Sequence, residues 1–470
     1  MVQVLDNEKF SSIQERREKG RILREQKPRS SHGIWKPMPS RPDPIILLQE
    51  HDKNRLKNLL PIKYGRMLVS PFAFMRGAAA VMAADLATTP ASGLQTQLCG
   101  DAHLSNFGIF ATPERKLVFD INDFDETYPG PWEWDLKRLA TSAVLAGKEK
   151  GFNNEINQEL AMIVTRSYQK AIENFVLVPA LDVWYYELEI SEVVKALSKS
   201  SQKDKKNAKK VLKEALYSTE LHTMEKLTEI AHGKRQIKNN PPLMVRLRET
   251  VPEEREGWIT ELDAKKLFEE YIDSLTEEKR HLVSHFRISS GALRVVGIGS
   301  VGTRCFILLL EGATQDDALI LQLKEADASV LEPYVAKKDY SSHAQRVVIG
   351  QKLMQAASDI FLAGIKDQIT GIDYYWRQFK DMKGSFDSDS LDKTGLETYL
   401  KFCSLCLARA HARTGDAACI SGYIGKSDVF CKAVTNFAIA YAEQTERDHQ
   451  ALKEAVKSGR IKAKNDWKTD

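Results

Sequence analysis

The residues best suited to chemistry in this sequence lie between positions 99 and 126. Asp101 and Asn106 are five residues apart in the stretch CGDAHLSN, and Asp123 and Asp125 follow in the stretch FDINDFDE. A loop aspartate can accept the proton of an attacking hydroxyl, while an asparagine and a later aspartate hold metal ions against phosphate oxygens. The pattern therefore indicates magnesium-dependent phosphoryl transfer.

Short strands, turns and helices are expected around these residues. Residues 94–98 alternate in polarity like a strand and lead directly into Gly100, and a short hairpin separates the two acidic stretches. An alanine-rich helix over 72–87 is expected to pack beneath them, and Asp135 is placed as the N-cap of a helix over 135–146. The acidic residues would thus lie on loops held by strands and helices.

A second candidate region begins almost two hundred residues later. The stretch GIGSVG at 297–302 fits G-x-G-x-x-G, and β-forming residues on both sides favour a strand–turn–strand hairpin over the strand–helix of a dinucleotide fold. In such a hairpin the backbone N–H groups can reach phosphates. Lys324 ends a further predicted strand over 318–325, where its amine would contact the same phosphates. Taken singly, the glycines fit an ordinary tight turn, and the lysine fits an edge-strand charge.

Together these stretches resemble the protein-kinase-like superfamily, especially the aminoglycoside and choline phosphotransferases. GDAHLSN is similar to that branch's G-D-x-H-x-x-N, and the DFD at 123–125 takes the place of its metal-binding aspartate motif. A closer resemblance, over about residues 20–460, is to the bacterial DUF2252 family. It is carried by CGDAHLSNFGIF, FDINDFDETYPGPWEWDLKRL, GIGSVGTRCF, KEADASVLEPY and ASDIFLAG.

The kinase-like resemblance implies a role for each matching residue. Asp101 would be the catalytic base, with His103 bracing its loop. Mg²⁺ would be held by Asn106 and Asp123, with Asp125 as a second aspartate ligand. Asp123 is preferred over Asp120 because the branch places its next structural aspartate twelve residues further on, at Asp135. The nucleotide phosphates of ATP would be held by Gly297, Gly299, Ser300, Gly302 and Lys324, and Glu332 is the nearest candidate for the acidic partner of that lysine.

The order of the motifs differs from that of kinases, in which the glycine loop and lysine precede the catalytic loop. The resemblance therefore implies an α+β, bilobal protein-kinase-like fold in circularly permuted order. We expect a basic N-terminal arm and helix over 1–60, a helical catalytic lobe over 61–290, a nucleotide-covering β lobe over 291–394, and C-terminal helices over 395–470 that pack on the catalytic lobe.

Two departures from the kinase-like pattern leave other functions open. Cys99 stands where the branch has histidine, and the helix expected over 342–357 contains no glutamate to pair with Lys324. The leading expectation is an ATP- and Mg²⁺-dependent phosphotransferase acting on a small-molecule hydroxyl. The alternatives are an enzyme that transfers AMP, a nucleotide-binding pseudokinase, and a magnesium phosphohydrolase that uses the aspartates alone.

Composition sets wider limits on function. The formal charge is +4 over 470 residues, which by itself indicates no nucleic-acid partner. No apolar run is long enough for a membrane span, and residues 1–10 lack the pattern of a signal peptide, so a cytoplasmic protein is expected. Six cysteines are too few for a disulfide scaffold, and Cys403 and Cys406 are expected in a helical core.

Two further clusters keep both a structural and a binding interpretation. The basic stretch over 16–29 fits a solvated helix and arm, although residues 29–32 could approach an anionic ligand. An aromatic group fits core packing or an acceptor pocket, and its members are Trp132, Trp134, Trp184, Tyr185 and Tyr186.

Overall fold

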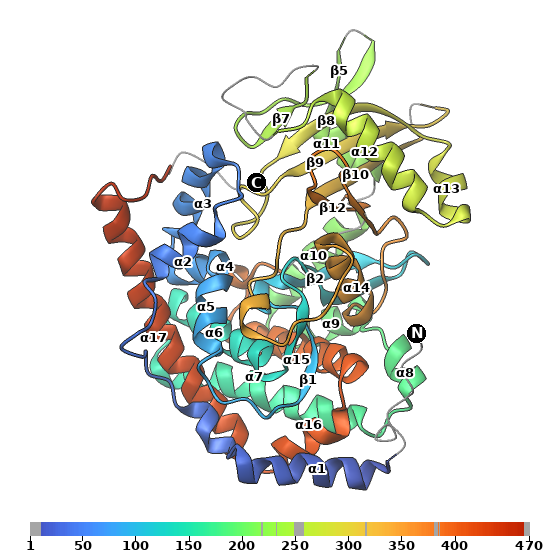
Figure 1. Cartoon of the computed structure of the whole chain (residues 1–470). Coiled ribbons are helices and arrows are strands. Elements are labelled where there is room, and N and C mark those ends of the chain that lie inside the picture. Colours follow the sequence, from blue (N-terminus) through green and yellow to red (C-terminus); the bar gives the residue numbers. More distant parts are fainter. Residues whose placement is uncertain are drawn as a thin grey trace.

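Helices and strands of this chain separate into a lower helical lobe and an upper sheet lobe (Figure 1). The computed structural model describes residues 11–217, 220–231, 233–248, 258–314, 317–379, 384 and 386–464. The mixture of helices with antiparallel strands confirms the expected α+β class.

The sheet lobe is built on an antiparallel sheet with the strand order β11-β12-β10-β9-β8-β7. Lys324 pairs with Cys305 on one side and with Tyr375 on the other, which places it in the middle of the sheet. In chain order the strands are β7 (Met244–Arg246), β8 (Arg287–Arg294), β9 (Cys305–Glu311), β10 (Ala318–Glu325), β11 (Ala363–Lys366) and β12 (Asp373–Gln378).

The continuous apolar run of β9 has a simple cause, because both faces of the sheet are covered. Phe306, Leu308 and Leu310 pack with helix α12 (Glu261–Ser274) on one face. Ile307 and Leu309 pack on the other face, against α11 (Glu220–Leu227) and the hairpin of β5 (Thr228–Ala231) and β6 (Lys234–Ile237). Helix α13 (Glu277–Val283) follows α12.

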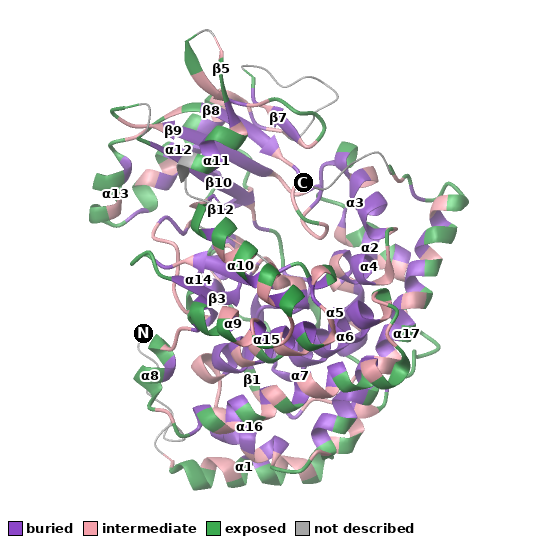
Figure 2. Cartoon of the chain, turned by 180° about the vertical axis from the view of Figure 1, so that it is seen from behind, coloured by how far each residue is buried: buried purple, intermediate pink, exposed green. Residues whose placement is uncertain are grey.

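The helical lobe is centred on α6 (Glu133–Glu149), most of whose residues are buried. Figure 2 shows buried helices in the interior of this lobe and exposed residues along α1, at its edge. Around α6 lie α1 (Ile13–Gln26), α2 (Pro44–His51), α3 (Leu60–Met67), α4 (Pro71–Gly77), α5 (Ala79–Leu86), α7 (Asn154–Phe175), α8 (Ala180–Tyr185), α9 (Ile190–Leu197), α10 (Gln202–Tyr217), α15 (Lys393–Thr414), α16 (Ala417–Ile424) and α17 (Val429–Lys457).

Two small strand pairs hold the acidic stretches where the lobes meet. β1 (Gln95–Leu98) pairs with β4 (Tyr128–Pro131), and β2 (Phe107–Ala111) pairs with β3 (Leu117–Ile121). The loop containing Asp101 and the loop containing Asp123 therefore begin and end at neighbouring strands. Helix α14 (His343–Met354) lies between β10 and β11 in the sequence.

Three expectations about local structure were wrong. Asp135 is not an N-cap, because α6 begins at Glu133 and the Asp135 carboxylate lies in its first turn. The expected 72–87 helix is two helices that separate at Ala78. The lobe boundary at 290 is also wrong, because β7 pairs with β8 and α12 buries its apolar face against the sheet.

The N-terminal arm is part of the helical lobe. Helix α1 runs along α16, and a side chain at Gly20 would collide with the carbonyl of Cys419. Arg29 donates to the carbonyl of Ile424 at 2.7 Å, which favours the structural interpretation of this basic stretch.

The cysteines and the apolar character of the helices bear on two further expectations. All six cysteines are buried and unpaired, and Cys403 and Cys406 lie inside α15 as expected. Across the described residues, we find no helix with the length and apolar character needed to cross a bilayer.

Candidate functional site

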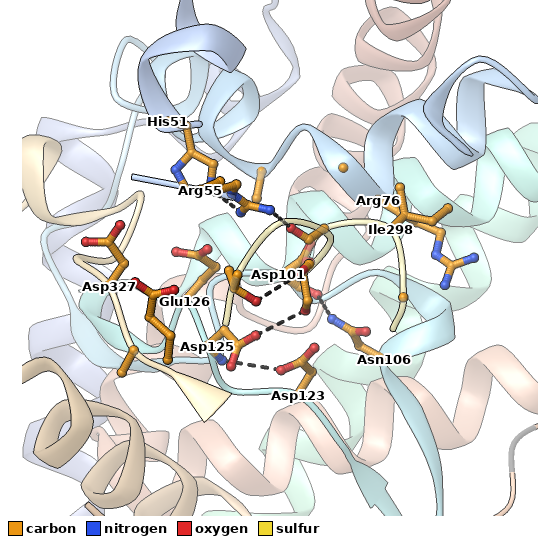
Figure 3. Close-up of a pocket in the computed structure, with 18 of the residues that line it drawn as sticks. His51, Arg55, Arg76, Asp101, Asn106, Asp123, Asp125, Glu126, Ile298 and Asp327 are labelled. Carbon is orange, nitrogen blue, oxygen red and sulfur yellow. Dashed lines mark hydrogen bonds between the residues drawn. The ribbon is translucent and has the colours of Figure 1, made fainter. Parts of the chain in front are cut away.

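A cavity at the junction of the two lobes is lined by residues from both candidate regions (Figure 3). Its volume is about 110 Å³, and a neighbouring cavity of about 750 Å³ shares Asn54, Arg55 and Asp327 with it. The sequence-predicted residues in its lining are Asp101, His103, Asn106, Asp123, Asp125, Gly297, Gly299 and Ser300.

The loop of Asp101 is fixed by its backbone. The Asp135 carboxylate accepts hydrogen bonds from the amides of Cys99 at 2.8 Å and Gly100 at 3.1 Å. Gly100 has a φ of +79°, and a Cβ there would collide with the carbonyl of Glu126. Glycine is therefore required where the strand turns into the loop, and Asp135 braces the loop from α6.

The Asp101 side chain is held by a buried arginine that the sequence did not point to. Arg138 Nε donates to Asp101 Oδ1 at 2.6 Å, and the Arg138 guanidinium also donates to the carbonyl of Met75 at 2.8 Å. Asn106 Nδ2 donates to the Asp101 carbonyl at 2.7 Å, which closes the loop on itself. Asp101 is thereby oriented, with one carboxylate oxygen committed to Arg138.

His103 lies beneath Asp101 in a buried position. Its Nε2 is 3.6 Å from Asp101 Oδ2. Burial lowers the pKa of His103 well below its usual value, and the charges of Arg76 and Arg138 lower it further. The imidazole is therefore neutral, which fits the expected bracing role and not that of an acid.

Asp123 and Asp125 form a close acidic pair. The Asp125 amide donates to Asp123 Oδ1 at 3.4 Å. Burial raises the pKa of Asp123, as does the neighbouring charge of Asp125. Burial also acts to raise the pKa of Asp125, but the charge of Lys324 and its hydrogen bond outweigh this and keep that pKa below its usual value. A further cation beside Asp123 would relieve the repulsion between the two carboxylates.

Lys324 joins the sheet lobe to this acidic pair. Its amine forms a short ion pair with Asp125 and hydrogen-bonds Ser300 Oγ at 3.0 Å. Tyr375, on the neighbouring strand, donates its hydroxyl to Asp125 Oδ1 at 2.6 Å. Lys324 is 2% exposed and lies behind the cavity lining, to which Asp125 and Ser300 belong.

The suggested partnership of Glu332 with Lys324 is corrected by these contacts. Glu332 accepts a hydrogen bond from the Ser329 amide at 2.9 Å and lies 3.5 Å from Arg346 and 3.6 Å from His343. The short turn after β10 directs Glu332 toward the start of α14, so the acidic partner of Lys324 comes from the other lobe.

The glycine loop between β8 and β9 is attached to the helical lobe. Arg55 donates to the carbonyls of Gly299 and Val301, the latter at 2.7 Å, and Arg66 donates to the carbonyl of Gly297. The amide of Leu56 also donates to the Gly302 carbonyl at 2.8 Å. The carbonyls of Gly297, Gly299, Val301 and Gly302 therefore all accept hydrogen bonds from the helical lobe. These bonds hold the loop across the cavity.

Asn106 and Asp123 are the expected protein ligands for Mg²⁺ in this cavity. Within the described ranges, no group of three or more His, Cys, Asp or Glu side chains is arranged to hold a metal. Asn106 and Asp123 line the same cavity. Mg²⁺ is commonly bound by one or two protein ligands together with water and substrate phosphates. The crowded Asp123–Asp125 pair, which a cation would stabilise, fits this mode of binding.

Other predicted groups lie outside the cavity lining. Trp132 is buried and stacks on Tyr168, whereas Trp184 and Tyr185 are 41% and 71% exposed. None of the five aromatic residues lines the central cavity, which favours packing over an acceptor role for Trp132.

The family comparison agrees with the closer of the two resemblances. Residues 55–455 match the DUF2252 family, which is described as an uncharacterised protein conserved in bacteria. No curated protein and no solved structure matches the chain. Since the match covers most of the sequence, including the acidic loops and the glycine loop, this chain belongs to the DUF2252 family.

Proposed function

We propose that this protein is a magnesium-dependent phosphotransferase that moves the γ-phosphoryl group of ATP to a small-molecule hydroxyl. The observation that carries the proposal is the ion pair of Lys324 with Asp125, between residues 199 positions apart, beside a cavity that Asp101 and Asn106 line. Phosphoryl transfer requires positioning and charge neutralisation more than covalent chemistry. These groups supply both.

Each residue has a defined part in the proposed reaction. Asp101 accepts the proton of the acceptor hydroxyl as its oxygen bonds to the γ-phosphorus and the bond to the bridging oxygen breaks, releasing ADP. Lys324 moves from Asp125 to the nucleotide phosphates, and backbone amides of the glycine loop face the same oxygens. Asn106 and Asp123 would hold Mg²⁺, which neutralises phosphate charge when bound.

The arrangement of elements supports a permuted kinase-like fold within this proposal. A glycine hairpin joins β8 and β9, the lysine lies on the next strand β10, and a helix follows, as in the kinase order. The acidic loops come from the other lobe and precede these strands in the sequence. Catalysis depends on where groups lie in space, so this reversal leaves the chemistry intact.

The base of the nucleotide would be bound in a different way from the one that is typical of kinases. The kinase signature places valine two residues after the last glycine and alanine two residues before the lysine. Here those positions are Arg304, paired with Glu325 at 2.8 Å, and Gln322, which accepts from Arg377 at 2.7 Å. These polar pairs replace the two apolar side chains that would contact the base. We therefore expect the nucleoside to occupy the larger neighbouring cavity, which Arg304 lines.

The test compares the wild-type protein with Asp101→Asn. We expect Asp101→Asn to keep the thermal stabilisation by Mg²⁺ and a non-hydrolysable ATP analogue but to lose at least about a hundredfold in ATP turnover. Asp182→Asn, on the exposed surface of α8, is the matched control and should behave as wild type. Equal turnover of the wild type and Asp101→Asn would refute the assigned base, and absence of nucleotide binding would refute the proposal. Mass spectrometry of the product separates phosphoryl from AMP transfer.

A further inference from the structure

Arg76 differs from the other arginines around the cavity. It lies near the end of α4 and lines the cavity beside Asp101. Arg55 and Arg66 donate to glycine-loop carbonyls, and Arg138 is bonded to Asp101. Within the described residues, Arg76 Nε is buried without a hydrogen-bond partner, and the Arg76 side chain forms no ion pair. A buried guanidinium atom of this kind calls for an acceptor.

Two of the three acidic groups near Arg76 are bonded to other groups. Asp101, Glu149 and Asp389 all act electrostatically on Arg76, but none is within ion-pair distance. Asp101 is bonded to Arg138, and Glu149 accepts from the Phe72 amide at 3.2 Å at the start of α4. The protein therefore places negative charge around Arg76 without giving its buried Nε–H an acceptor.

A second cation strengthens the attraction for anions at this end of the cavity. Arg66, from α3, is 5% exposed and lies close enough to Arg76 for the two positive charges to oppose each other. Two guanidinium groups close together are characteristic of sites for phosphate or carboxylate groups.

The position of Arg76 relates it to the proposed transfer. A Cβ at Gly299 would lie 3.0 Å from the Arg76 carbonyl, so the tip of the glycine loop meets α4 here. Figure 3 shows Arg76 at one end of the cavity and Asp327 at the other, with Asp101 between them. The nucleoside is expected on the Asp327 side, which leaves the Arg76 end for the group that reacts with the terminal phosphate.

We propose that Arg76 binds an oxyanion, a phosphate or carboxylate group, at the acceptor end of the cavity. The identification of this end as the acceptor side rests on the proposed function. The favoured source of the oxyanion is the acceptor, which would then be a hydroxyl compound that carries an anionic group. The other source with the same chemistry is the terminal phosphate of the nucleotide.

Inorganic phosphate is a suitable probe because it needs no knowledge of the acceptor. Its affinity is measured by calorimetry for the wild type, Arg76→Gln, Arg76→Lys and the control Arg166→Gln, whose side chain pairs with Asp428 on the surface. We expect Arg76→Gln to lose at least about tenfold in phosphate affinity, Arg76→Lys to recover part of it, and the control to match wild type. Circular dichroism and thermal melting identify any variant that fails to fold, and Arg76→Lys then provides the comparison.

A competition experiment separates the two sources. Phosphate binding that persists with saturating Mg²⁺ and a non-hydrolysable ATP analogue supports an anionic acceptor. Phosphate displaced by the analogue shows that the Arg76 site takes the nucleotide's terminal phosphate and overturns the acceptor assignment. Undetectable phosphate binding, or equal affinity in Arg76→Gln and wild type, overturns the oxyanion site itself. The phosphate affinities of the variants are measured without nucleotide, so they are independent of whether ATP binds. The competition is interpreted only once thermal stabilisation has shown that the analogue is bound.

Discussion

Asp120 and Asp123 are three residues apart and have opposite surroundings. The Asp120 carboxylate is 1% exposed, pairs with Arg409 and accepts from the Ala356 amide at 2.7 Å. The pKa of Asp123 is raised by burial and by the charge of Asp125, against the opposing charges of Lys324 and Arg377. Its carboxylate accepts from the Asp125 amide, and Asp123 lines the cavity. One aspartate therefore stabilises the helical lobe, while the other is available to a ligand.

The first prediction compares Asp120→Asn with Asp123→Asn. Asp120→Asn leaves the Arg409 guanidinium buried without its counter-charge, so we expect a loss of about 3–5 kcal/mol in the free energy of unfolding. Asp123→Asn removes a repulsion with Asp125, so stability should be kept or raised while magnesium-dependent ATP turnover falls at least about a hundredfold. Urea denaturation and a turnover assay provide the two measurements. An Asp123→Asn protein that is fully active would contradict the assignment of Asp123.

The glycine loop is held in place by Arg55 and by the residues that bind this arginine. In addition to its two loop carbonyls, Arg55 pairs with Asp52 at 3.1 Å and contacts His51 at 2.8 Å. Asp52 also binds Lys63 and Tyr64, so the arginine is itself anchored to α3. The loop is therefore attached to the helical lobe before any ligand binds.

The second prediction concerns Arg55→Ala. Loss of the guanidinium frees the loop carbonyls, so amide hydrogen exchange in residues 297–303 should accelerate at least about tenfold. Arg16→Ala, which removes a partly exposed pair between α1 and Asp416, is the control and should leave exchange in this segment unchanged. Unchanged exchange in Arg55→Ala would mean that the loop is held by other contacts.

The third prediction concerns the close packing of α1 against α16. A Cβ at Gly20 would lie 1.9 Å from the Cys419 carbonyl oxygen, which is backbone and cannot swing away. Alanine gains about 1 kcal/mol in helix propensity over glycine, but separating the helices costs more. We expect Gly20→Ala to lose about 1–2 kcal/mol of unfolding free energy in chemical denaturation. Gln14→Ala, at an exposed site on α1, should show no loss, and equal stability of the two variants would contradict this packing.

At the scale of the whole molecule, stability depends on His32, which joins the N-terminal arm to the helical lobe. His32 is fully buried, and its Nε2 lies 2.7 Å from the hydroxyl of Tyr423. Burial lowers the pKa of His32 to about 3, with smaller effects from the charges of Lys137 and Lys27. Between about pH 3 and about pH 6.5 the unfolded chain therefore binds a proton that the folded chain does not.

The fourth prediction follows from this difference. Because the unfolded state binds more protons, stability should rise with pH through this window, by up to about 1.4 kcal/mol per pH unit from this one group. His32→Gln should remove that share, so its stability relative to wild type should improve as the pH falls from 7.5 to 5. Urea denaturation at both pH values measures it. A difference between the two proteins that is independent of pH would contradict the burial of a neutral imidazole.

The elements that the sequence predicted well are those with local signals. The strand over 318–325 was expected with the bounds of β10, and the glycines were placed between two strands. The site residues that sequence reasoning missed contact partners that are far away in the sequence. Arg138 meets Asp101 across 37 positions, and Arg55 meets Val301 across 246. Arginines at such positions look like ordinary helix or loop charges until the lobes pack, and no local pattern marks them.

The helical lobe is assembled from two stretches on either side of the sheet lobe, and this division affects how the protein is made. Helix α7 packs against α15, yet ~220 residues separate the end of one from the start of the other. A ribosome adding about 5–20 residues per second needs roughly 10–40 s to cover that gap. Throughout this time α7 has α6 to pack against but lacks α15. Production of folded protein should accordingly depend on chaperones that shield the uncovered part of α7 until translation reaches α15.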